Sequence, residues 1–198
     1  MIEHEPNLPA TVAQALSAAA TLGVERLDAQ LLLLHALGRT SDGRAWLLAH
    51  DSDALAPEAA ARFQADLLRR VAGEPVAFLL GEKEFHGLVL QVDARVLVPR
   101  PDTETLVDWA IACLHGLREV RVMDLGTGSG AIALALQKAR SDLQTHAVDA
   151  NQDALAVARA NAERLGLPVR FAHGNWLEGA GSGYSLIGGN PPYLPQED

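Results

Sequence analysis

The segment 124–130 has the composition of a ligand-binding loop, because it reads Asp-Leu-Gly-Thr-Gly-Ser-Gly. It follows one apolar run and leads directly into a second that begins at Ala131. Glycines allow the backbone to turn sharply and to approach a ligand closely, since no Cβ blocks the approach. Strand, glycine-rich loop and helix in this order favour a cofactor site, although a plain glycine-rich turn explains the segment equally well when it is taken alone.

An acidic residue, Asp149, ends the next expected strand, 19 residues after Gly130. At this place a carboxylate meets the two ribose hydroxyls of a nucleoside cofactor. A dinucleotide site and an S-adenosylmethionine site both satisfy this pattern. The dinucleotide fingerprint has its third glycine one position later, where Ala131 stands, but alanine is sometimes accepted there. The loop by itself therefore leaves both cofactors open.

The segment 173–176, His-Gly-Asn-Trp, follows the third expected strand, at the edge where an adenine base would lie. Asn175 is suited to hydrogen-bond the base, and Trp176 is suited to pack on it. A tryptophan of the core is an equally good interpretation of Trp176 taken by itself.

The tetrapeptide Asn190-Pro191-Pro192-Tyr193 follows the fourth expected strand, at the same carboxyl edge of the sheet as the glycine loop. An amide nitrogen is a poor nucleophile, so an enzyme that modifies one must hold it in line with the reacting carbon and accept its hydrogens. Asn190 offers a side-chain oxygen and Pro191 a backbone carbonyl, and consecutive prolines stiffen the loop. Tyr193 is suited to stack on the planar amide. A proline-rich turn is the alternative, and the nearby glycine loop argues against it.

The elements that position these residues divide into three parts. Apolar residues at helical spacing predict a small all-α bundle of four helices over residues 1–72, in which the third is a short helix at 44–49 and the fourth spans 57–72. Residues 73–100 form a connector, in which a β-hairpin turns at His86-Gly87. Residues 101–198 begin with a helix that ends near residue 114, for which Thr103 is a candidate cap.

Strands and helices alternate in the rest of the chain, which predicts an α/β fold with a parallel, Rossmann-like sheet. The expected strands are residues 120–125, 145–148, 169–172 and 185–188, and the expected helices between them are residues 131–138 and 152–165. His35 is expected in the core, and Trp46 and Trp109 are expected to be packing residues.

Composition limits the function classes. The formal net charge is −9, and the longest run of basic residues is Arg69-Arg70, so a nucleic-acid substrate is disfavoured. An acidic surface suits a basic protein partner, or it merely keeps the protein soluble. The single cysteine, Cys113, excludes an internal disulfide and a cysteine zinc cluster, and it fits a reducing cytoplasm. No metal-ligand spacing, targeting signal or membrane-spanning stretch is recognised.

At this point the sequence resembles the HemK/PrmC family of protein-(glutamine-N5) methyltransferases. The resemblance covers nearly the whole chain. Its motifs are Gly-Glu-Lys-Glu-Phe at 81–85, Val-Pro-Arg-Pro-Asp-Thr-Glu at 98–104, the glycine loop, Ala-Val-Asp at 147–149 and the Asn-Pro-Pro-Tyr motif at 190–193. Adenine-N6 DNA methyltransferases share the last motif but lack the segment 99–104, which is the most specific.

The resemblance implies a class I methyltransferase that transfers a methyl group from S-adenosyl-L-methionine to the Gly-Gly-Gln glutamine of class 1 release factors, in translation termination. The family's pattern implies that the helical bundle grips the release factor. A monomer is expected, although no feature of the sequence determines the oligomeric state. The family's pattern also implies site roles. The residues for the cofactor are Gly126, Thr127, Gly128, Ser129, Gly130, Asp149, Asn175, Trp176 and Asn190, and those for the glutamine are Asn190, Pro191, Pro192 and Tyr193. The sequence itself leaves two roles open for Arg100, which either binds and steers the substrate or pairs with Asp102 or Glu104.

Members of the family continue through further strands that complete a seven-stranded sheet, whereas residues 101–198 hold four expected strands. We therefore expect a C-terminally truncated sheet and weak or absent activity, because apolar faces would be left uncovered. Two other interpretations stay open: an adenine-N6 nucleic-acid methyltransferase, and an inactive cofactor-binding module.

Overall fold

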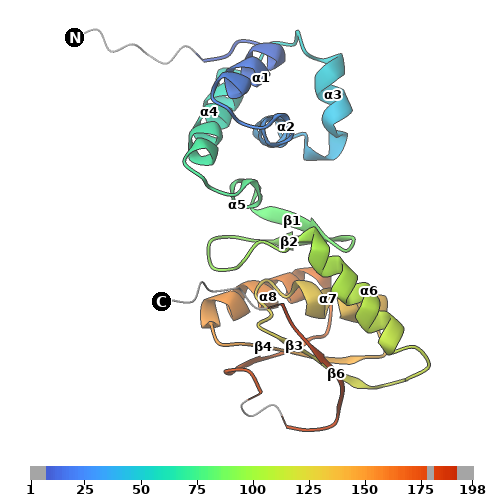
Figure 1. Ribbon diagram of the computed structural model, residues 1–198. Coiled ribbons are helices and arrows are strands. Elements are labelled where there is room, and N and C mark those ends of the chain that lie inside the picture. The colour runs from blue at the N-terminus through green and yellow to red at the C-terminus, as the bar shows by residue number, and fades with distance from the viewer. Residues whose placement is uncertain (1–7, 178–180, 191–198) are drawn as a thin grey trace. The chain divides into compact units, whose positions relative to one another are not determined.

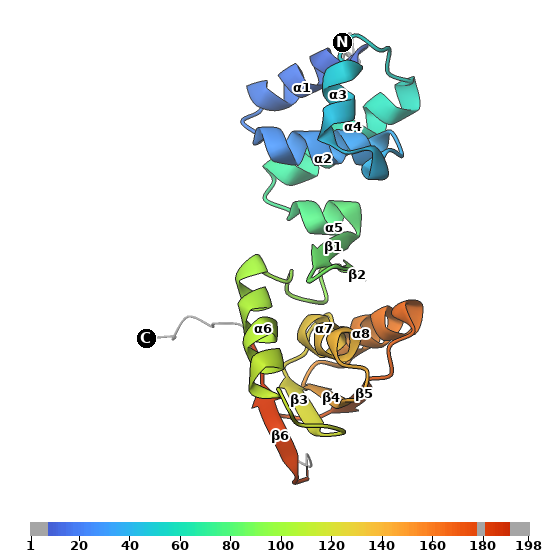
Figure 2. The ribbon, with the colours of Figure 1, turned by 90° about the vertical axis from the view of Figure 1, so that its right-hand side faces the viewer.

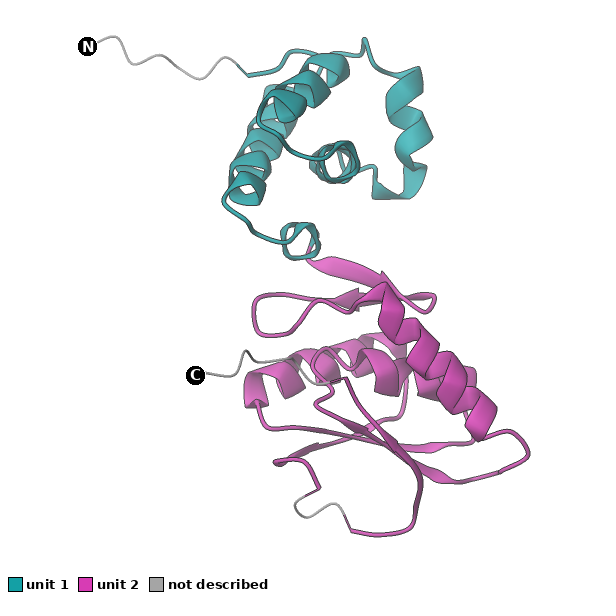
Figure 3. Cartoon of the chain, in the orientation of Figure 1, with its two compact units in different colours: residues 1–80 teal, residues 81–198 magenta. Residues whose placement is uncertain are grey.

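The computed structural model describes residues 8–177 and 181–190. The chain divides into two compact units, residues 1–80 and 81–198 (Figure 3). The first unit extends beyond residue 72, where the sequence placed the end of the bundle. The extension is a short helix, α5 (Val76–Leu80), which contacts two other helices of the same unit and so belongs with them.

The first unit is all-helical in its described part. Its elements are α1 (Val12–Thr21), α2 (Arg26–Ala36), η1 (Thr40–Asp42), α3 (Arg44–Ala49), α4 (Pro57–Val71) and α5. Local signals set the helix starts: the Thr11 hydroxyl accepts a hydrogen bond from Gln14 N at the start of α1, and Pro57 opens α4. The core contains Leu32, Leu33 and Phe63, each fully buried. The helical prediction for this region is confirmed.

Two packing predictions are wrong. His35 is exposed, because the buried positions of α2 include Leu34 and Ala36 on either side of it and leave residue 35 on the outer face. Trp109 is 62% exposed on its helix. Trp46, in contrast, is half-buried against the helical core, as expected.

The second unit begins with a two-stranded antiparallel hairpin of β1 (Glu82–Phe85) and β2 (Leu88–Gln91). Phe85 pairs with Leu88, so His86 and Gly87 alone form the turn. Their φ angles are 49° and 71°, and positive φ at both positions is the conformation that a two-residue hairpin favours. The predicted hairpin is confirmed.

The rest of the second unit is an α/β sheet unit, as predicted. Its elements are η2 (Pro101–Thr103), α6 (Glu104–Cys113), β3 (Arg121–Leu125), α7 (Ala131–Ala139), β4 (Gln144–Asp149), α8 (Gln152–Leu165), β5 (Arg170–His173) and β6 (Tyr184–Gly188). The four strands are parallel, in the order β5-β4-β3-β6. Helices α6, α7 and α8 lie on one side of this sheet (Figures 1 and 2). Val122 and Leu134 are among the fully buried residues of the core between them.

This topology determines where a ligand can bind. The chain runs from β3 to β4 to β5 on one side, and then returns to place β6 on the other side of β3. In open parallel sheets the crevice at the carboxyl ends of the strands where the order reverses is the usual ligand site. Here that crevice lies next to the residues that follow β3, β4 and β6.

Candidate functional site

The glycine loop between β3 and α7 has a backbone conformation that residues with side chains rarely adopt. Gly126, Gly128 and Gly130 all have positive φ, at 66°, 54° and 85°. A Cβ on Gly130 would lie 3.0 Å from Leu134 Cδ1 and 3.3 Å from Ala158 Cβ, so the loop packs closely on α7 and α8 at this point. A Cβ on Gly128 would meet nothing within 4 Å, which leaves open space beside the loop. The glycines therefore serve both backbone conformation and ligand access.

Asp124 stabilises the glycine loop through hydrogen bonds in the protein interior. Its side chain is 1% exposed, and its Oδ2 accepts hydrogen bonds from Thr127 Oγ1 at 2.6 Å and from Ala133 N at 3.2 Å, in the first turn of α7. Burial raises the pKa of Asp124 to about 7. Thr127 therefore directs its hydroxyl into the protein, and the part it plays in the loop is to bind this carboxyl group.

Asp149, at the end of β4, is joined to the loop. Its Oδ2 accepts from Gly128 N at 2.8 Å, and its Oδ1 accepts from Asn151 N at 2.9 Å. Each carboxylate oxygen has a further lone pair, so the group keeps the capacity to accept hydrogen bonds from a pair of hydroxyls. The geometry thus holds an acidic side chain beside the glycine loop, where the sequence expected it.

A hollow of about 480 Å³ opens at this edge of the sheet. Ligand pockets commonly have volumes between about 300 and 1,000 Å³. The walls come from the residues that follow four strands and from one further segment. They include Gly126 and Gly128 after β3, residues 148–151 at β4, residues 174–176 after β5, Asn190 after β6 and residues 95–97 after β2. Six of the predicted site residues, Gly126, Gly128, Asp149, Asn175, Trp176 and Asn190, therefore line one hollow.

Trp176 belongs to the wall of this hollow and not to the core. Its side chain is 59% exposed, and its φ is 53°, which is uncommon for a residue with a side chain. The preceding segment is tied to β4, since Gly174 N donates to Asp149 O at 3.1 Å and the ring of His173 hydrogen-bonds Ala150 O at 3.0 Å. The core interpretation of Trp176 is therefore wrong.

A smaller cleft of about 60 Å³ adjoins the loop on the side of the segment 97–103. Thr127, Ser129 and Arg100 line it together with Asn190. Ser129 is 2% exposed, and Gly130 lines neither of these two hollows. Of the five loop residues assigned to a cofactor, Gly126 and Gly128 thus have open space of ligand size beside them, whereas the other three support the loop.

Asn190 connects two segments that the sequence treated separately. Its Nδ2 donates to Thr103 Oγ1 at 2.9 Å, across 87 positions of the chain. The prediction that Thr103 caps α6 is wrong: Thr103 has helical angles, φ −69° and ψ −18°, and makes no side-chain cap hydrogen bond. The 3-10 turn η2 precedes α6 without a break, so the hydroxyl is available to Asn190. Pro191, Pro192 and Tyr193 lie outside the described residues.

Arg100 is exposed at the rim of the smaller cleft. Within residues 8–177 and 181–190 it forms no ion pair with Asp102 or Glu104, and Glu104 Oε1 instead accepts from His86 N at 3.1 Å. Of the two roles considered for Arg100, the pairing role has no support in the described part of the chain.

The segment 95–97 is the part of the site that the sequence did not indicate. Its conformation depends on Asp93, whose carboxylate accepts from Arg95 N, Nε and Nη2, with the shortest contact 2.6 Å. Arg95 holds the pKa of Asp93 below its usual value. An Asp-x-Arg pair is a weak sequence signal, because such pairs also occur as isolated surface contacts.

The described residues contain no group of three or more His, Cys, Asp or Glu side chains that could hold a metal ion. None of the helices described is both long and apolar enough to cross a membrane.

Comparison with known proteins gives the family. The model of the PrmC N-terminal domain matches residues 10–81, and that of the methyltransferase small domain matches residues 105–198. The release factor glutamine methyltransferase of Burkholderia pseudomallei is 40% identical over 198 residues, with 96% of this chain and 67% of that protein covered. The chain belongs to the release factor glutamine methyltransferase family.

Two further members of the family match over most of this chain. The protein of Bordetella pertussis is 48% identical over 178 residues, which covers 89% of this chain and 65% of that protein. The protein of Escherichia coli is 42% identical over 175 residues, which covers 87% of this chain and 62% of that protein. The chain thus spans a little under two thirds of the length of these two relatives.

Proposed function

We propose that this chain carries the methyl-donor site and the amide-binding site of a protein-(glutamine-N5) methyltransferase. The donor is S-adenosyl-L-methionine, and the acceptor is the glutamine of the Gly-Gly-Gln motif in class 1 release factors. One observation carries the proposal: Asn190, the first residue of the Asn-Pro-Pro-Tyr motif, lines the same hollow as Gly128 and Asp149. Names of the relatives support the choice of substrate.

The residues present fit the donor. The carboxylate of Asp149 would accept hydrogen bonds from the ribose hydroxyls, and it is already aligned by Gly128 N and Asn151 N. Gly126 and Gly128 line the hollow, and the open space beside Gly128 would take the amino-acid part of the donor. Trp176 offers an exposed ring face for the adenine, with Asn175 next to it as a polar partner. When bound, the donor supplies a methyl group on a positively charged sulfur.

The protein's task is to position a weak nucleophile. The glutamine nitrogen must lie in line with the methyl carbon, and its hydrogens need acceptors. Asn190 Oδ1 is one acceptor, and the hydrogen bond from Asn190 Nδ2 to Thr103 Oγ1 holds the side chain in place before substrate arrives. By the family's pattern we assign the carbonyl of Pro191 as the second acceptor, Pro192 to stiffening the turn and Tyr193 to stacking on the amide.

The nitrogen forms its bond to the methyl carbon while the bond between that carbon and sulfur breaks, with the electron pair passing to sulfur. The nitrogen would then lose one proton to water, past the acceptor oxygens of Asn190 and Pro191, which leaves a neutral secondary amide. An in-line displacement of this kind needs both partners in a single cleft, so the shared hollow is the feature that the proposal requires.

The helical unit, residues 1–80, is assigned to binding the release factor, with Arg100 at the cleft rim steering the substrate. A formal net charge of −9 supports a basic protein surface as the partner over nucleic acid. The single cysteine fits a protein that works in the cytoplasm, and we assign a monomer.

The test is a mass spectrum of a class 1 release factor after long incubation with S-adenosylmethionine and a stoichiometric amount of the chain, so that even the weak turnover expected above is detected. The proposal expects one added methyl group on the peptide that contains the Gly-Gly-Gln glutamine, and none when this glutamine is replaced by glutamate. A parallel reaction with duplex DNA tests the adenine-N6 alternative. Methylated DNA with unmodified release factor, or binding of S-adenosylhomocysteine without transfer to either substrate, contradicts the proposed activity.

A further inference from the structure

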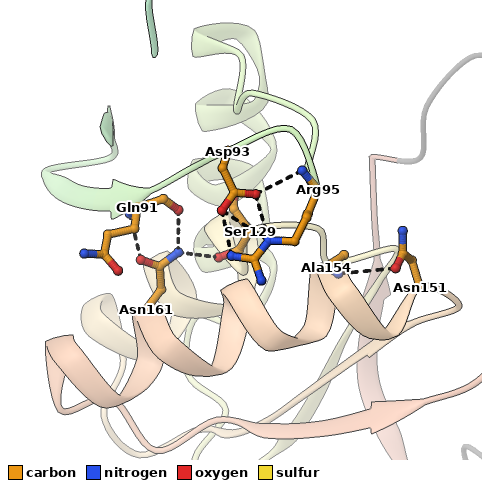
Figure 4. Close-up of polar contacts among 7 residues, drawn as sticks. All are labelled: Gln91, Asp93, Arg95, Ser129, Asn151, Ala154 and Asn161. Carbon is orange, nitrogen blue, oxygen red and sulfur yellow. Dashed lines mark hydrogen bonds and ion pairs between the residues drawn. The ribbon is translucent and has the colours of Figure 1, made fainter. Parts of the chain in front are cut away.

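Asn161 of α8 is a fully buried amide whose hydrogen-bonding groups connect three distant segments (Figure 4). Its Nδ2 donates to Ser129 O at 3.0 Å and to Gln91 O at 2.9 Å. Its Oδ1 accepts from Gln91 N at 2.7 Å, and a longer contact of 3.4 Å comes from Arg164 Nη2. Both amide hydrogens and the oxygen are therefore used.

Packing alone does not explain an asparagine at this place. The helix faces the sheet with small apolar residues, among them Ala154, Ala158 and Ala162. Burying an amide is unfavourable unless all its groups are satisfied, whereas alanine would favour the helix and need no partner. Asn161 hydrogen-bonds three partner atoms, Ser129 O, Gln91 O and Gln91 N, and alanine has no side-chain group that could do so.

The two partner residues, Ser129 and Gln91, do not line the hollow themselves, but each is in a segment that leads into one of its walls. Ser129 lies in the glycine loop, directly after Gly128, which lines the hollow. Gln91 ends β2 and leads into the turn at Asp93 and Arg95, whose segment 95–97 forms another wall. A single side chain thus hydrogen-bonds the backbone of the loop and the backbone at the start of the second wall.

We propose that Asn161 is a positioning residue that fixes the distance and register between the glycine loop and the segment 91–97, and so preforms the donor hollow. The nature of the ligand rests on the function proposed above; the mechanical role does not. Loss of the Nδ2 donors removes a hydrogen bond from the buried carbonyl of Ser129 and from the partly buried carbonyl of Gln91, and the loop and the wall then move independently.

The variant Asn161→Asp tests this role, because it keeps the size and the acceptor for Gln91 N but replaces the donor by an oxygen that faces the carbonyls of Ser129 and Gln91. Asn161→Ala is the second variant, in case the aspartate does not fold. Val157→Ala is the control: Val157 is 3% exposed on the same helix and lines neither hollow, so this change weakens packing alone.

Two readouts are needed. Hydrogen exchange follows the loop amides, of which Gly126 N and Thr127 N bond Val148 O, and also the amide of Gln91. Calorimetry measures the affinity for S-adenosylhomocysteine. Both Asn161 variants should raise exchange selectively at residues 126–130, and Asn161→Ala should raise it at residue 91 as well. Both should weaken binding by about tenfold, the equivalent of one lost hydrogen bond. The control should lower stability without either effect.

The positioning role would be overturned if the Asn161 variants changed the hydrogen exchange of the loop and the affinity for S-adenosylhomocysteine no more than Val157→Ala does. If the unmodified chain does not bind S-adenosylhomocysteine, the proposed function fails, but the exchange measurement still decides the role of Asn161. The two proposals can therefore fail separately.

Discussion

Gly128 and Gly130 are two residues apart, yet the structure predicts different consequences for an added methyl group. At Gly130 the new Cβ would lie 3.0 Å from Leu134 Cδ1 and 3.3 Å from Ala158 Cβ, with φ at +85°. At Gly128 it would meet nothing within 4 Å, with φ at +54°. Gly130→Ala should therefore damage folding, and Gly128→Ala should damage ligand binding.

The magnitudes follow from these contacts. Alanine in the left-handed region costs about 1–2 kcal/mol, and this cost applies to both glycines. Overpacking adds about 1–3 kcal/mol at Gly130 alone, so the free energy of unfolding should fall by about 2–5 kcal/mol in Gly130→Ala. The Gly128→Ala methyl instead occupies open space beside the loop, where the donor is expected, and we predict that binding of S-adenosylhomocysteine weakens by at least about tenfold.

Urea unfolding and calorimetry measure the two effects. Gly116→Ala is the matched control, because Gly116 has φ +79°, has open space around its Cβ and lies outside both hollows. It should lose as much stability as Gly128→Ala while binding S-adenosylhomocysteine normally. The reasoning is refuted if Gly130→Ala is as stable as Gly116→Ala, or if Gly128→Ala binds the ligand as the unmodified chain does.

Three further predictions concern single polar groups. Asn190→Ala should leave S-adenosylhomocysteine affinity nearly unchanged in calorimetry but slow methyl transfer at least about a hundredfold; weaker ligand binding with normal turnover would contradict its role. The pKa of Asp124 in the folded protein is about 7, above the usual 3.8, so the native state binds a proton that the unfolded state releases between these pH values. The free energy of unfolding, measured relative to Asp124→Asn, should therefore fall by up to about 4 kcal/mol as the pH rises from about 4 to about 7. Urea unfolding of both proteins at several pH values checks this, and a difference independent of pH would disprove it. Asn151→Ala should cost about 1 kcal/mol in urea unfolding, because Asn151 Oδ1 caps α8 through Asp153 N at 2.8 Å; unchanged stability would argue against the cap.

Features governed by neighbouring residues were predictable from the sequence. The hairpin turn at His86-Gly87, the helix α3 and the helix α8 occur where local patterns placed them. The strand pattern also predicted that Asp149 and Asn190 lie at one edge of the sheet, because parallel strands bring their carboxyl ends together.

Features that depend on distant residues were not predictable in this way. Thr103 looked like a helix cap, but its hydroxyl accepts from Asn190, which no local rule can detect. Gln91, which leads toward the wall at 95–97, hydrogen-bonds Asn161, 70 positions further along the chain. The helix α5 is only five residues long and follows Pro75, so a short apolar run there gave no helical period to recognise.

The most direct test of the account is a crystal structure of this chain with S-adenosylhomocysteine bound. The account predicts that the ribose hydroxyls bind the carboxylate of Asp149, that the adenine lies on Trp176, and that the sulfur faces the side-chain oxygen of Asn190. A nucleoside bound elsewhere, or a sulfur separated from Asn190 by the glycine loop, would contradict the claim that methyl donor and glutamine meet in one cleft.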